Sequence, residues 1–432
     1  MMFWSPAIER MPMEELRQIQ EKKLKALVRN VYEYSPFYKR KFRELGIHPT
    51  DIQSLEDLKK LPFTKKQDLR DNYPFGMFAV PLSQIVRFHA SSGTTGKPTL
   101  VGYTEDDIRV WVESLCRGFV SCGVTNEDIM QIAYGYGLFT GGLGFHYAAE
   151  KIGATALPVS AGNTERQINL MKDLGVTVIA CTPSYILYMA EYAEKMGINI
   201  RETDLRMGIF GAEPWSEETR RRIEDKTGIT AYDVYGTSEL SGPLFTECIE
   251  KNGLHVWADH FLIEVIDPKT GENVGEGEKG ELVVTTLSKE AMPLIRWRTG
   301  DITIMETEKC NCGRTHPRIM RILGRSDDML IVRGVNVFPS QIEHVLMQIP
   351  EVSEHYMIIL DRKEELDEMT VQVELSDKVS IDKPVDVLNL ARKIEEKLKI
   401  ILGISAKVEL VNPGTLQRFE GKAKRVIDKR RI

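Results

Sequence analysis

The sequence predicts an α/β protein with a large N-terminal domain of α/β sheets, which includes a small β subdomain, and a small α+β C-terminal domain. Short apolar runs alternate with helical patterns in the first half of the chain, and an antiparallel β texture begins after Gly242. A compact α+β pattern follows Arg325. The length of 432 residues suits two or three domains. We place the domains at 1–325 and 326–432, with the β subdomain at about 243–323.

The N-terminal region is expected to be helical. Its apolar residues recur near helical spacing at Leu16, Ile19, Leu24, Leu27, Val28 and Val31. The dipeptide Ser35-Pro36 ends this run, because proline has no backbone N–H to continue the ladder of hydrogen bonds. The first forty residues are therefore predicted to be helical, with the apolar run ending at this dipeptide.

Four buried strands are predicted, and each leads into a loop that contains glycine, serine or threonine. They cover residues 129–134, 176–181, 206–210 and 231–235. Helical patterns over 164–174 and 183–196 lie between them. Repeated strand, loop and helix units form parallel sheets, and ligands gather at the carboxyl ends of such strands. Functional residues are therefore expected in the loops after these strands.

The second half of the chain has a different pattern. Two antiparallel strands are expected over 261–267 and 281–287, joined through a turn-rich segment. In the C-terminal domain, residues 370–375 alternate as a strand does. One helix there has an apolar stripe formed by Val387, Ala391, Ile394, Leu398 and Ile401.

The composition excludes several classes of function. With 42% hydrophobic and 28% charged residues and a formal charge of -6, the chain offers no basic surface for nucleic acid. No apolar run reaches the ~18 residues of a membrane span, and the N-terminus has no signal-peptide pattern. Six cysteines in so long a chain do not form a disulfide framework, so we expect a cytoplasmic protein with reduced thiols. A homodimer is compatible with these features, although the sequence does not determine the oligomeric state.

One polar segment is the most informative part of the chain. It combines hydroxyl donors, two glycines, a lysine and a closing proline, in the order Ser91, Ser92, Gly93, Thr94, Thr95, Gly96, Lys97, Pro98 and Thr99. Backbone N–H groups, hydroxyls and a mobile ammonium suit the phosphates of ATP. The Walker pattern is not met, because Ser91 and Pro98 occupy its decisive positions. The segment, which we call the phosphate loop, therefore predicts an ATP site of another kind.

Two further polar segments follow predicted strands. In Tyr235-Gly236-Thr237-Ser238-Glu239, the carboxylate of Glu239 offers Mg²⁺ the hard oxygen ligand that it prefers beside ATP. Thr237 in the same segment could reach a phosphate. The segment Gly211-Ala212-Glu213-Pro214 permits close approach of the backbone, which suits the flat edge of a base.

Two more segments complete the set of nucleotide-binding candidates. In Arg298-Thr299-Gly300-Asp301, the carboxylate of Asp301 could accept two hydrogen bonds from ribose hydroxyls. The strongly basic segment Gly421-Lys422-Ala423-Lys424-Arg425 lies near the C-terminus. Each short segment is a common surface feature when taken alone, so their order along the chain decides their meaning.

In that order, the segments resemble the motifs of the adenylate-forming enzymes, which include acyl-CoA synthetases, peptide-synthetase adenylation domains and luciferases. The matching order is the phosphate loop, 235–239, 298–301, 324–328 and Lys422, nearly the full length of the chain. Local phrases are similar to the shorter phenylacetate–CoA ligase branch. They are Ser35-Pro36-Phe37-Tyr38, Leu61-Pro62-Phe63-Thr64-Lys65, and the stretches 134–142 and 254–261.

The resemblance implies a two-step reaction that uses ATP, Mg²⁺ and coenzyme A. A carboxylate attacks the α-phosphorus of ATP to give acyl-AMP and pyrophosphate, and the CoA thiol then displaces AMP to give a thioester. By similarity, Lys422 is the catalytic lysine that bridges the carboxylate and the phosphate oxygens. Lys97 would help to hold the β- and γ-phosphates, and Mg²⁺ on Glu239 would neutralise the charge of ATP.

The resemblance also implies a mobile C-terminal domain that rotates between the two steps. Its hinge matches Asp327, in a polar segment able to absorb large changes in backbone dihedral angles. Rotation would withdraw Lys422 and place Arg325 near the ribose. It would also bring Arg333 and Gly334 to the CoA side of the acyl-adenylate. The alternative is an ordinary glycine-initiated turn at this position.

Specificity for the acyl group is expected around residues 134–142. Glycines such as Gly141 leave room there, and Tyr136 and Phe139 can form the walls of a flat apolar slot for an aromatic ring. The alternative is that the two aromatic rings pack in the core, because pockets and cores use the same residues. The expected substrate is phenylacetate or a close arylacetate such as indoleacetate.

A separate structural zinc site is predicted from four residues with soft donors: Cys248, His255, Cys310 and Cys312. Three thiolates and an imidazole suit tetrahedral Zn²⁺, which would staple the β subdomain and not catalyse. His260 or His316 could replace His255 as the fourth ligand, and reduced thiols with a surface imidazole are the alternative. The other three cysteines are expected to be core thiols: Cys116, Cys122 and Cys181.

Two rival functions stay open. One is an adenylyltransferase of the same superfamily that acts without CoA, for example on a deazaflavin coenzyme. Pyrophosphate release without consumption of CoA would indicate that function. The other is a non-catalytic, zinc-containing nucleotide-binding regulator. The acidic net charge and the presence of the expected catalytic and binding side chains argue against a regulator.

Overall fold

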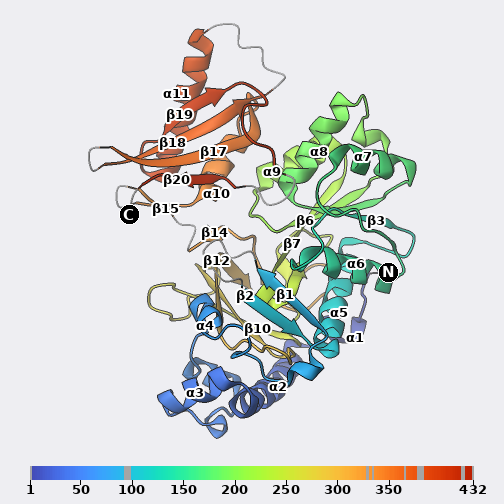
Figure 1. Ribbon diagram of the computed structural model, residues 1–432, viewed down its shortest axis with the longest axis vertical. Helices are drawn as coiled ribbons and strands as arrows, with labels where there is room; N and C mark the ends of the chain where they lie inside the picture. The colour runs from blue at the N-terminus through green and yellow to red at the C-terminus, as the bar shows by residue number, and fades with distance from the viewer. Residues whose placement is uncertain are drawn as a thin grey trace.

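The structure is a computed structural model that describes residues 2–91, 99–326, 330–332, 335–363, 366–376, 384–419 and 424–430. Figure 1 shows a large body formed by the N-terminal part of the chain and a smaller body formed by the C-terminal elements. The chain begins with helices α1 (Pro6–Glu9), α2 (Met13–Tyr34), α3 (Pro36–Leu45) and α4 (Lys66–Asp71). Short 3₁₀ turns follow at Pro49–Asp51, Leu55–Lys60, Leu82–Gln84 and Ile200–Glu202, with η5 at Ser238–Leu240.

The predicted N-terminal helix and its break are confirmed. Ser35 is both the C-cap of α2 and the N-cap of α3, and Pro36 occupies the first turn of α3, where its missing N–H costs nothing. The predicted stripe of α2 faces the core. Ile19 is half-buried, and the other positions are buried: Leu16, Leu24, Leu27, Val28 and Val31.

One sheet of twelve described strands organises the large body, in the order β10-β11-β12-β13-β9-β8-β7-β6-β5-β3-β4, with β14 paired to β12. Its parallel part comprises β3 (Ile129–Ile132), β4 (Thr155–Leu157), β5 (Val178–Cys181), β6 (Met207–Gly211) and β7 (Thr230–Thr237). The four predicted strands are therefore confirmed as parallel neighbours. Helices pack around this part of the sheet: α5 (Glu105–Cys122), α6 (Gly141–Ile152), α7 (Thr164–Asp173), α8 (Pro183–Lys195) and α9 (Glu217–Thr227).

The antiparallel strands continue the same sheet. They are β8 (Gly242–Thr246), β9 (Leu254–His255), β10 (Phe261–Ile266), β11 (Lys279–Thr286), β12 (Trp297–Glu306), β13 (Arg318–Ile319) and β14 (Gly324–Arg325). β10 and β11 pair antiparallel as predicted, with Phe261 opposite Thr286. The predicted β subdomain is joined to the parallel strands through β7 and β8, where Val234 lies opposite Thr246. A separate hairpin consists of β1 (Arg87–Ser91) and β2 (Thr99–Tyr103).

The C-terminal elements have an apolar core of their own. They are β15 (Leu330–Val332), β16 (Val335–Val337), α10 (Pro339–Met347), β17 (Val352–Lys363), β18 (Leu366–Leu375), α11 (Pro384–Leu402), β19 (Lys407–Val411) and β20 (Val426–Asp428). The sheet order is β19-β18-β17-β20, and β18 contains the predicted strand at 370–375. The predicted stripe of α11 is wrong at one position: Ile401 is 46% exposed, whereas Leu402 is buried. One residue turns a helix by about 100°, so Leu402 and not Ile401 shares the face of Leu398.

Helices α9 and α10 join the two bodies. The guanidinium of Arg222 on α9 donates to four backbone carbonyls at and after the end of α10, at distances between 2.9 and 3.4 Å: Leu346, Met347, Ile349 and Val352. Carbonyls at a helix C-terminus have no partner within the helix and carry partial negative charge, so a cation is stabilised there. Thr219 of α9 also donates to Glu343 of α10 at 2.8 Å.

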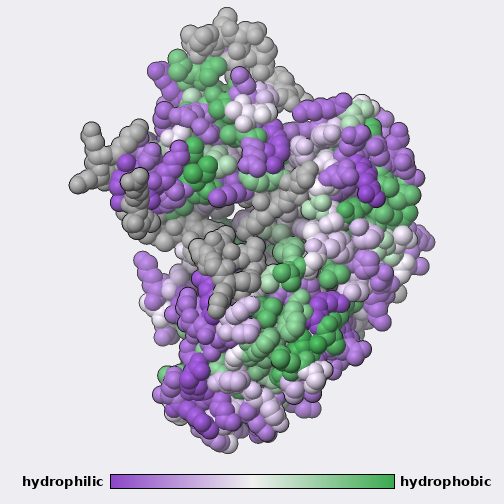
Figure 2. All heavy atoms as spheres, viewed as in Figure 1, coloured by the Kyte–Doolittle hydropathy of each residue, from purple (hydrophilic) through white to green (hydrophobic). Residues whose placement is uncertain are grey.

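One apolar area of the surface lies over the β1–β2 hairpin. Figure 2 shows a hydrophobic area over the β1–β2 hairpin, where Val86 is 59% exposed and Phe88 is 40% exposed. Phe88 stacks on Phe78, with 6.2 Å between the ring centroids. None of the described helices combines the length and the apolar character needed to cross a bilayer.

Candidate active site

Parallel strands β6 and β7 bring two predicted binding segments to the same edge of the sheet. Gly211 at the end of β6 lies opposite Val234 of β7, so residues 211–214 and 235–239 leave adjacent strands. A Cβ atom on Gly211 would lie 2.3 Å from the carbonyl oxygen of Val234, so this approach requires glycine. The next residue, Ala212, has a φ of 69°, which turns the backbone away from the sheet.

Glu213 fastens its segment to a helix. Its Oε1 accepts a hydrogen bond of 2.8 Å from the backbone N–H of Ser184, in the first turn of α8. A carboxylate is stabilised at this end of a helix by the free N–H groups and by the helix dipole. Ala212 and Pro214 on either side are exposed. The structure therefore gives Glu213 a positioning contact and leaves the edge of the neighbouring backbone accessible to a base.

Asp301 contacts two other predicted nucleotide-binding residues, Tyr235 and Arg325. Its Oδ2 accepts a hydrogen bond of 2.6 Å from the hydroxyl of Tyr235, and its Oδ1 accepts one of 2.8 Å from Nη1 of Arg325. Strand register places Asp301 on β12 opposite Arg325 on β14. Burial and the Asp301 carboxylate raise the pKa of Tyr235, so its hydroxyl keeps its proton and donates. Residues from three separate motifs are therefore linked through one buried carboxylate.

The η5 turn that carries Glu239 is held by two side chains outside the predicted motifs. The hydroxyl of Tyr103 donates to the carbonyl of Ser238 at 2.9 Å. The Nζ of Lys289 donates to the carbonyl of Glu239 at 3.0 Å. Ser241, which follows the turn, has a φ of 108°, a conformation that a non-glycine residue rarely adopts. Sequence reasoning missed Tyr103 and Lys289, because neither belongs to a motif and both act on a distant backbone.

Lys289 is also unusual in its protonation. Burial lowers the pKa of Lys289 to about 8, against the opposing effect of the Asp107 and Glu239 carboxylates. Lys289 is 7% exposed. An ammonium in such a place is stabilised by the oxygens that it contacts and by nearby carboxylates.

Thr237 presents a polar atom that has no partner among the described residues. Its Oγ1 is buried and makes no hydrogen bond there. A buried hydroxyl without a partner costs about 1–3 kcal/mol, so a ligand atom is expected to complete its bonding. Glu239 is 6% exposed, and within the described ranges no group donates to its carboxylate. Both observations support a site for phosphate and its metal ion at this turn.

The ends of the phosphate loop lie beside the same turn. Ser91 ends β1 opposite Thr99, which begins β2, and both strands contact η5. The other residues of the phosphate loop lie outside the described residues: Ser92, Gly93, Thr94, Thr95, Gly96, Lys97 and Pro98. Four other predicted site residues also lie outside them: Asp327, Arg333, Gly334 and Lys422. The roles given to all of these residues stay predictions.

The two predicted walls of the acyl slot differ in their surroundings. Tyr136 packs against the main core, and its hydroxyl lies 3.3 Å from Nδ1 of His146. Phe139 is 41% exposed, which contradicts core packing for this ring. A Cβ atom on Gly141 would lie 2.4 Å from the Phe139 ring, so the glycine lets that ring fold back over the start of α6. Tyr134 is different again, because it is buried and donates to the carbonyl of Cys181 at 2.6 Å.

The four predicted zinc ligands come together. The ligand atoms of Cys248, His255, Cys310 and Cys312 all lie within 4.8 Å of one another, and all four residues are buried. The Sγ atoms of Cys248 and Cys310 are 3.8 Å apart, and Cys312 Sγ lies 3.4 Å from Nε2 of His255. Burial lowers the pKa of His255, which favours the neutral imidazole that binds metals. Three sulfurs and one nitrogen in this arrangement fit the tetrahedral preference of Zn²⁺.

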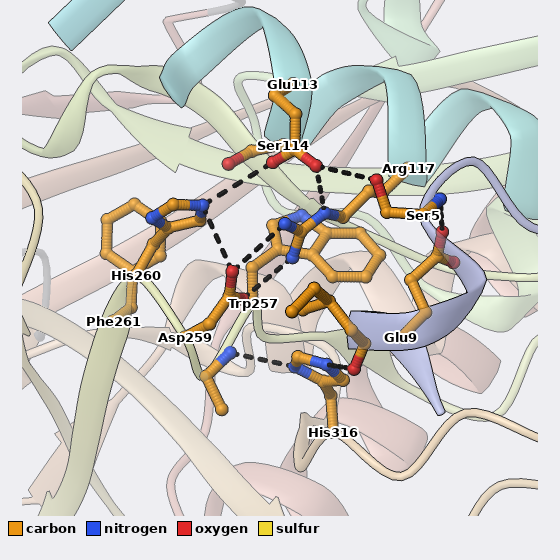
Figure 3. Close-up of polar contacts among 12 residues, drawn as sticks. Ser5, Glu9, Glu113, Ser114, Arg117, Trp257, Asp259, His260, Phe261 and His316 are labelled. Carbon is orange, nitrogen blue, oxygen red and sulfur yellow. Dashed lines mark hydrogen bonds and ion pairs between the residues drawn. The ribbon is translucent and has the colours of Figure 1, made fainter. Parts of the chain in front are cut away.

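The two alternative histidines are engaged elsewhere. His316 accepts from the backbone N–H of Ala258 at 2.9 Å through Nδ1, and its Nε2 lies 2.9 Å from the carbonyl of Ile8. His260 contacts Asp259 at 3.2 Å, and Arg117 makes two hydrogen bonds to the same carboxylate (Figure 3). Of the three histidines, His255 is therefore the one placed with the sulfurs. The remaining cysteines are buried free thiols, as predicted: Cys116, Cys122 and Cys181.

Comparison with known proteins places this geometry in a family. The family model for AMP-binding enzymes matches residues 39–288, and the model for the AMP-binding enzyme C-terminal domain matches residues 334–430. The chain is 48% identical to a phenylacetate-coenzyme A ligase of Thermus thermophilus over 100% of both chains. It is 47% identical to a phenylacetate-coenzyme A ligase of Escherichia coli, over 98% of this chain and 97% of that one.

A solved structure supports the same assignment. A 2-hydroxyisobutyryl-CoA ligase in the postadenylation state, with 2-HIB-AMP, is 31% identical and has a TM-score of 0.94, covering 99% of this chain and 93% of that chain. The same enzyme with 2-HIB-AMP and CoA in the thioesterification state is 32% identical, with a TM-score of 0.74 over 100% and 93%. The two bodies here are thus arranged more nearly as in the first structure. With its adenylate-forming fold of a large AMP-binding domain and a small C-terminal domain, the chain belongs to the phenylacetate–CoA ligase family.

Proposed function

We propose that the protein is an AMP-forming acid–CoA ligase that activates phenylacetate, or a close arylacetate such as indoleacetate, with ATP and transfers the acyl group to coenzyme A. The observation that carries this proposal is that Asp301 bonds to both Tyr235 and Arg325, while Thr237 at the end of β7 has a buried hydroxyl without a described partner. Identity of 48% over the full length of a phenylacetate-coenzyme A ligase supports the substrate class.

In the first step, an oxygen of the substrate carboxylate forms a bond to the α-phosphorus of ATP, and pyrophosphate leaves. The protein must hold two anions together and stabilise the charge that develops. Asp301 accepts hydrogen bonds from the ribose hydroxyls, and Thr237 donates to a phosphate oxygen. Lys422 bridges the carboxylate and the phosphate oxygens, while Lys97 and the hydroxyls of the phosphate loop bind the β- and γ-phosphates. Residues 211–214 lie along the edge of the adenine.

Glu239 is the residue that would hold Mg²⁺. Its buried carboxylate lies in the turn directly after Thr237 and supplies the hard oxygen that this ion prefers. When bound, Mg²⁺ neutralises part of the charge on the ATP phosphates. Glu239 therefore acts as a binding residue, and the proton of the substrate carboxyl needs no base, because a carboxylic acid is already ionised at pH 7.

In the second step, the CoA thiol attacks the acyl carbonyl and AMP leaves. We infer that a C-terminal domain over 326–432 rotates on Asp327 relative to a domain over 1–325, which withdraws Lys422. Arg333 and Gly334 then face the CoA side. The TM-scores of 0.94 and 0.74 against two states of one relative support a change in the arrangement of the two bodies.

The acyl group is expected to lie against residues 134–142. Phe139 and Tyr136 would form the walls for an aromatic ring, and Gly141 would leave the room that the ring needs. The exposure of Phe139, at 41%, supports a role in binding, because the free energy falls when a ligand covers a large apolar ring that is otherwise in water.

We also propose that Cys248, His255, Cys310 and Cys312 bind a structural Zn²⁺. Donor type and spacing in the structure support this site. The metal would link the strand that carries His255 to the loop that carries Cys310 and Cys312, and it takes no part in the reaction. None of the six cysteines, all of which are described, forms a disulfide, which supports a reducing, cytoplasmic location. A homodimer stays a prediction, which sedimentation equilibrium tests.

The test of the proposed function is an assay of AMP formation with arylacetic, benzoic and fatty acids, each with and without CoA. We expect phenylacetate to give AMP and a stoichiometric amount of thioester. Pyrophosphate release with no use of CoA would instead indicate the adenylyltransferase. Reaction of long aliphatic acids alone would contradict the aromatic slot.

A lysine variant separates an enzyme from a binding protein. Lys422→Ala should abolish adenylation while ATP binding remains, because the lysine acts on the reacting oxygens. The matched control is Lys424→Ala, which removes a basic residue of the same segment. Equal activity of Lys422→Ala and the parent protein would contradict its catalytic role.

A further inference from the structure

Lys289 is a buried lysine that no step of the proposed reaction uses. It lies after β11, and its Nζ donates to the carbonyl of Glu239 at 3.0 Å and to Oγ of Ser241 at 3.4 Å. The same ammonium lies 4.4 Å from the centroid of the Tyr103 ring, where a cation is attracted to the face of the ring. One side chain therefore contacts the turn that carries the predicted magnesium ligand and the residue that follows the turn.

The backbone next to Lys289 is held by hydrogen bonds to Asp107. The carboxylate of Asp107 accepts hydrogen bonds from the backbone N–H groups of Glu290 at 2.6 Å and Ala291 at 3.0 Å. Asp107 also accepts from the backbone N–H of Thr104 at the start of α5. The two residues directly after Lys289 are thus bonded to the first turn of the long helix α5, which fixes the backbone from which the ammonium reaches the η5 turn.

The position of this charge has an energetic consequence. A buried ammonium is destabilising unless nearby acceptors and carboxylates offset the loss of water. The carboxylate of Asp107 is engaged with backbone N–H groups, and the other carboxylate that acts on the ammonium is that of Glu239. A charge kept at such a cost is typical of a functional site more than of a packing position.

We propose that Lys289 is a positioning residue for Glu239. By holding the Glu239 carbonyl and the Ser241 hydroxyl, it fixes the η5 turn so that the Glu239 carboxylate faces the metal ion on ATP. Because the ammonium bonds to the carbonyl, the carboxylate stays available to the metal. The inference rests on the proposed function of Glu239 as a magnesium ligand.

The experiment compares Lys289→Met with Lys23→Met. Lys23 is the matched control, because its Nζ also donates to a backbone carbonyl, that of Asp259 at 2.7 Å, and to a serine hydroxyl, that of Ser288 at 2.8 Å. Pyrophosphate release is measured against Mg²⁺ concentration. Thioester formation is measured separately from supplied phenylacetyl-adenylate and CoA, a step with no pyrophosphate to neutralise.

We expect Lys289→Met to raise the half-saturating Mg²⁺ concentration for adenylation about ten-fold, as removal of an outer partner of a metal ligand commonly does. The rate from supplied adenylate should stay within about two-fold of the parent, and Lys289→Arg should restore part of the magnesium affinity. Lys23→Met should leave the magnesium dependence unchanged. A fall of both half-reactions in step with a lower Tm would show a merely structural role and overturn the proposal.

Two further variants separate this inference from the proposed function. Glu239→Gln should itself raise the half-saturating Mg²⁺ concentration for adenylation. The double variant with Lys289→Met should raise it no further, because the lysine acts through that carboxylate. An unchanged magnesium dependence in Glu239→Gln would refute the role of Glu239. A clear loss in Glu239→Gln with none in Lys289→Met would refute the role of Lys289 alone. If Lys289→Met does not fold, Lys289→Gln, whose shorter side chain cannot reach both oxygens, must still raise the half-saturating Mg²⁺ concentration or the proposal fails.

Discussion

Nη1 of Arg325 lies 2.8 Å from Oδ1 of Asp301, and strand pairing sets the two residues opposite each other. Arg325 is the last residue of β14, directly before the segment that leads to the C-terminal body. The predicted ribose ligand is therefore bonded to the strand at which that segment begins. We propose that occupation of the nucleotide site and the position of the C-terminal body are linked at this point.

Asp301→Asn should weaken nucleotide binding. Loss of the charged acceptor for ribose hydroxyls is expected to cost about 2–3 kcal/mol, which lowers kcat/KM for ATP roughly 30- to 160-fold. ATP–pyrophosphate exchange measures this effect. Glu306→Gln on the same strand is the control and should leave kcat/KM unchanged. Parent-like kinetics for Asp301→Asn would exclude Asp301 as a ribose ligand.

Arg222→Ala should favour separation of the two bodies. It removes hydrogen bonds from Arg222 to four carbonyls of the C-terminal body, an expected loss of about 1–2 kcal/mol for the described arrangement. Adenylation should fall roughly five- to thirty-fold, while thioester formation from supplied adenylate should not fall. The control is Arg221→Ala, an exposed neighbour on α9. Equal loss of both half-reactions would contradict a contact specific to one arrangement.

Removal of zinc should destabilise the large body without a direct effect on the chemistry. Metal analysis of the parent protein is expected to give about one zinc per chain, and Cys312→Ser should lose it. Loss of about 3 kcal/mol corresponds to a fall in Tm of roughly 4–5 °C for a body of this size. Cys181→Ser, at a buried thiol outside the cluster, should keep its zinc. A parent protein that contains no zinc after purification without chelators would refute the site.

Glu9→Gln should be strongly destabilising, because it leaves Arg314 buried without its ion pair. Nε of Arg314 lies 2.7 Å from Oε2 of Glu9, and the two side chains are 1% and 0% exposed. Breaking a buried pair on one side costs about 3–5 kcal/mol, which urea unfolding measures. Glu56→Gln breaks the exposed pair with Arg17 and should leave the free energy of unfolding unchanged. Similar results for the two variants would contradict the prediction.

Stability should fall as the pH is lowered from about 6.5 to about 4. Burial lowers the pKa of His316 to about 4 from 6.5, opposed by its bond to Ile8 and by Asp259, with Arg117 and His255 adding to the decrease. Between these values the unfolded chain binds a proton that the folded protein excludes, so up to about 3 kcal/mol is lost over this window.

The variant His316→Asn tests that origin. An amide can accept from Ala258 and donate to Ile8 as the imidazole does, and it does not titrate. Urea unfolding at several pH values should show a flatter curve for the variant between about pH 6.5 and pH 4. An identical slope in both proteins would assign the pH dependence to other groups.

Much of the fold and the chemistry of the site was predictable from local patterns. The alternation of apolar runs with helical stretches predicted the parallel strands, and the end of α2 was predicted from Ser35-Pro36. The segments that contain Tyr235 and Asp301 are common surface features when taken alone, and it was their order along the chain that indicated the family. The prediction for α11 was wrong at Ile401. Ile401 and Leu402 are both apolar, so the sequence pattern did not show which of the two faces the core.

What the sequence by itself determined was the order of strands and helices, the family and the types of side chain available for ATP, metal and acid. Only the tertiary structure decided which of them meet. In the folded protein, Lys289 donates to the carbonyl of Glu239 and Arg325 donates to Asp301. His255, and neither His260 nor His316, lies with the three cysteines. The physical reason is that these contacts join residues far apart in the chain. Their distances depend on strand register and on the packing of whole elements, which no local pattern records.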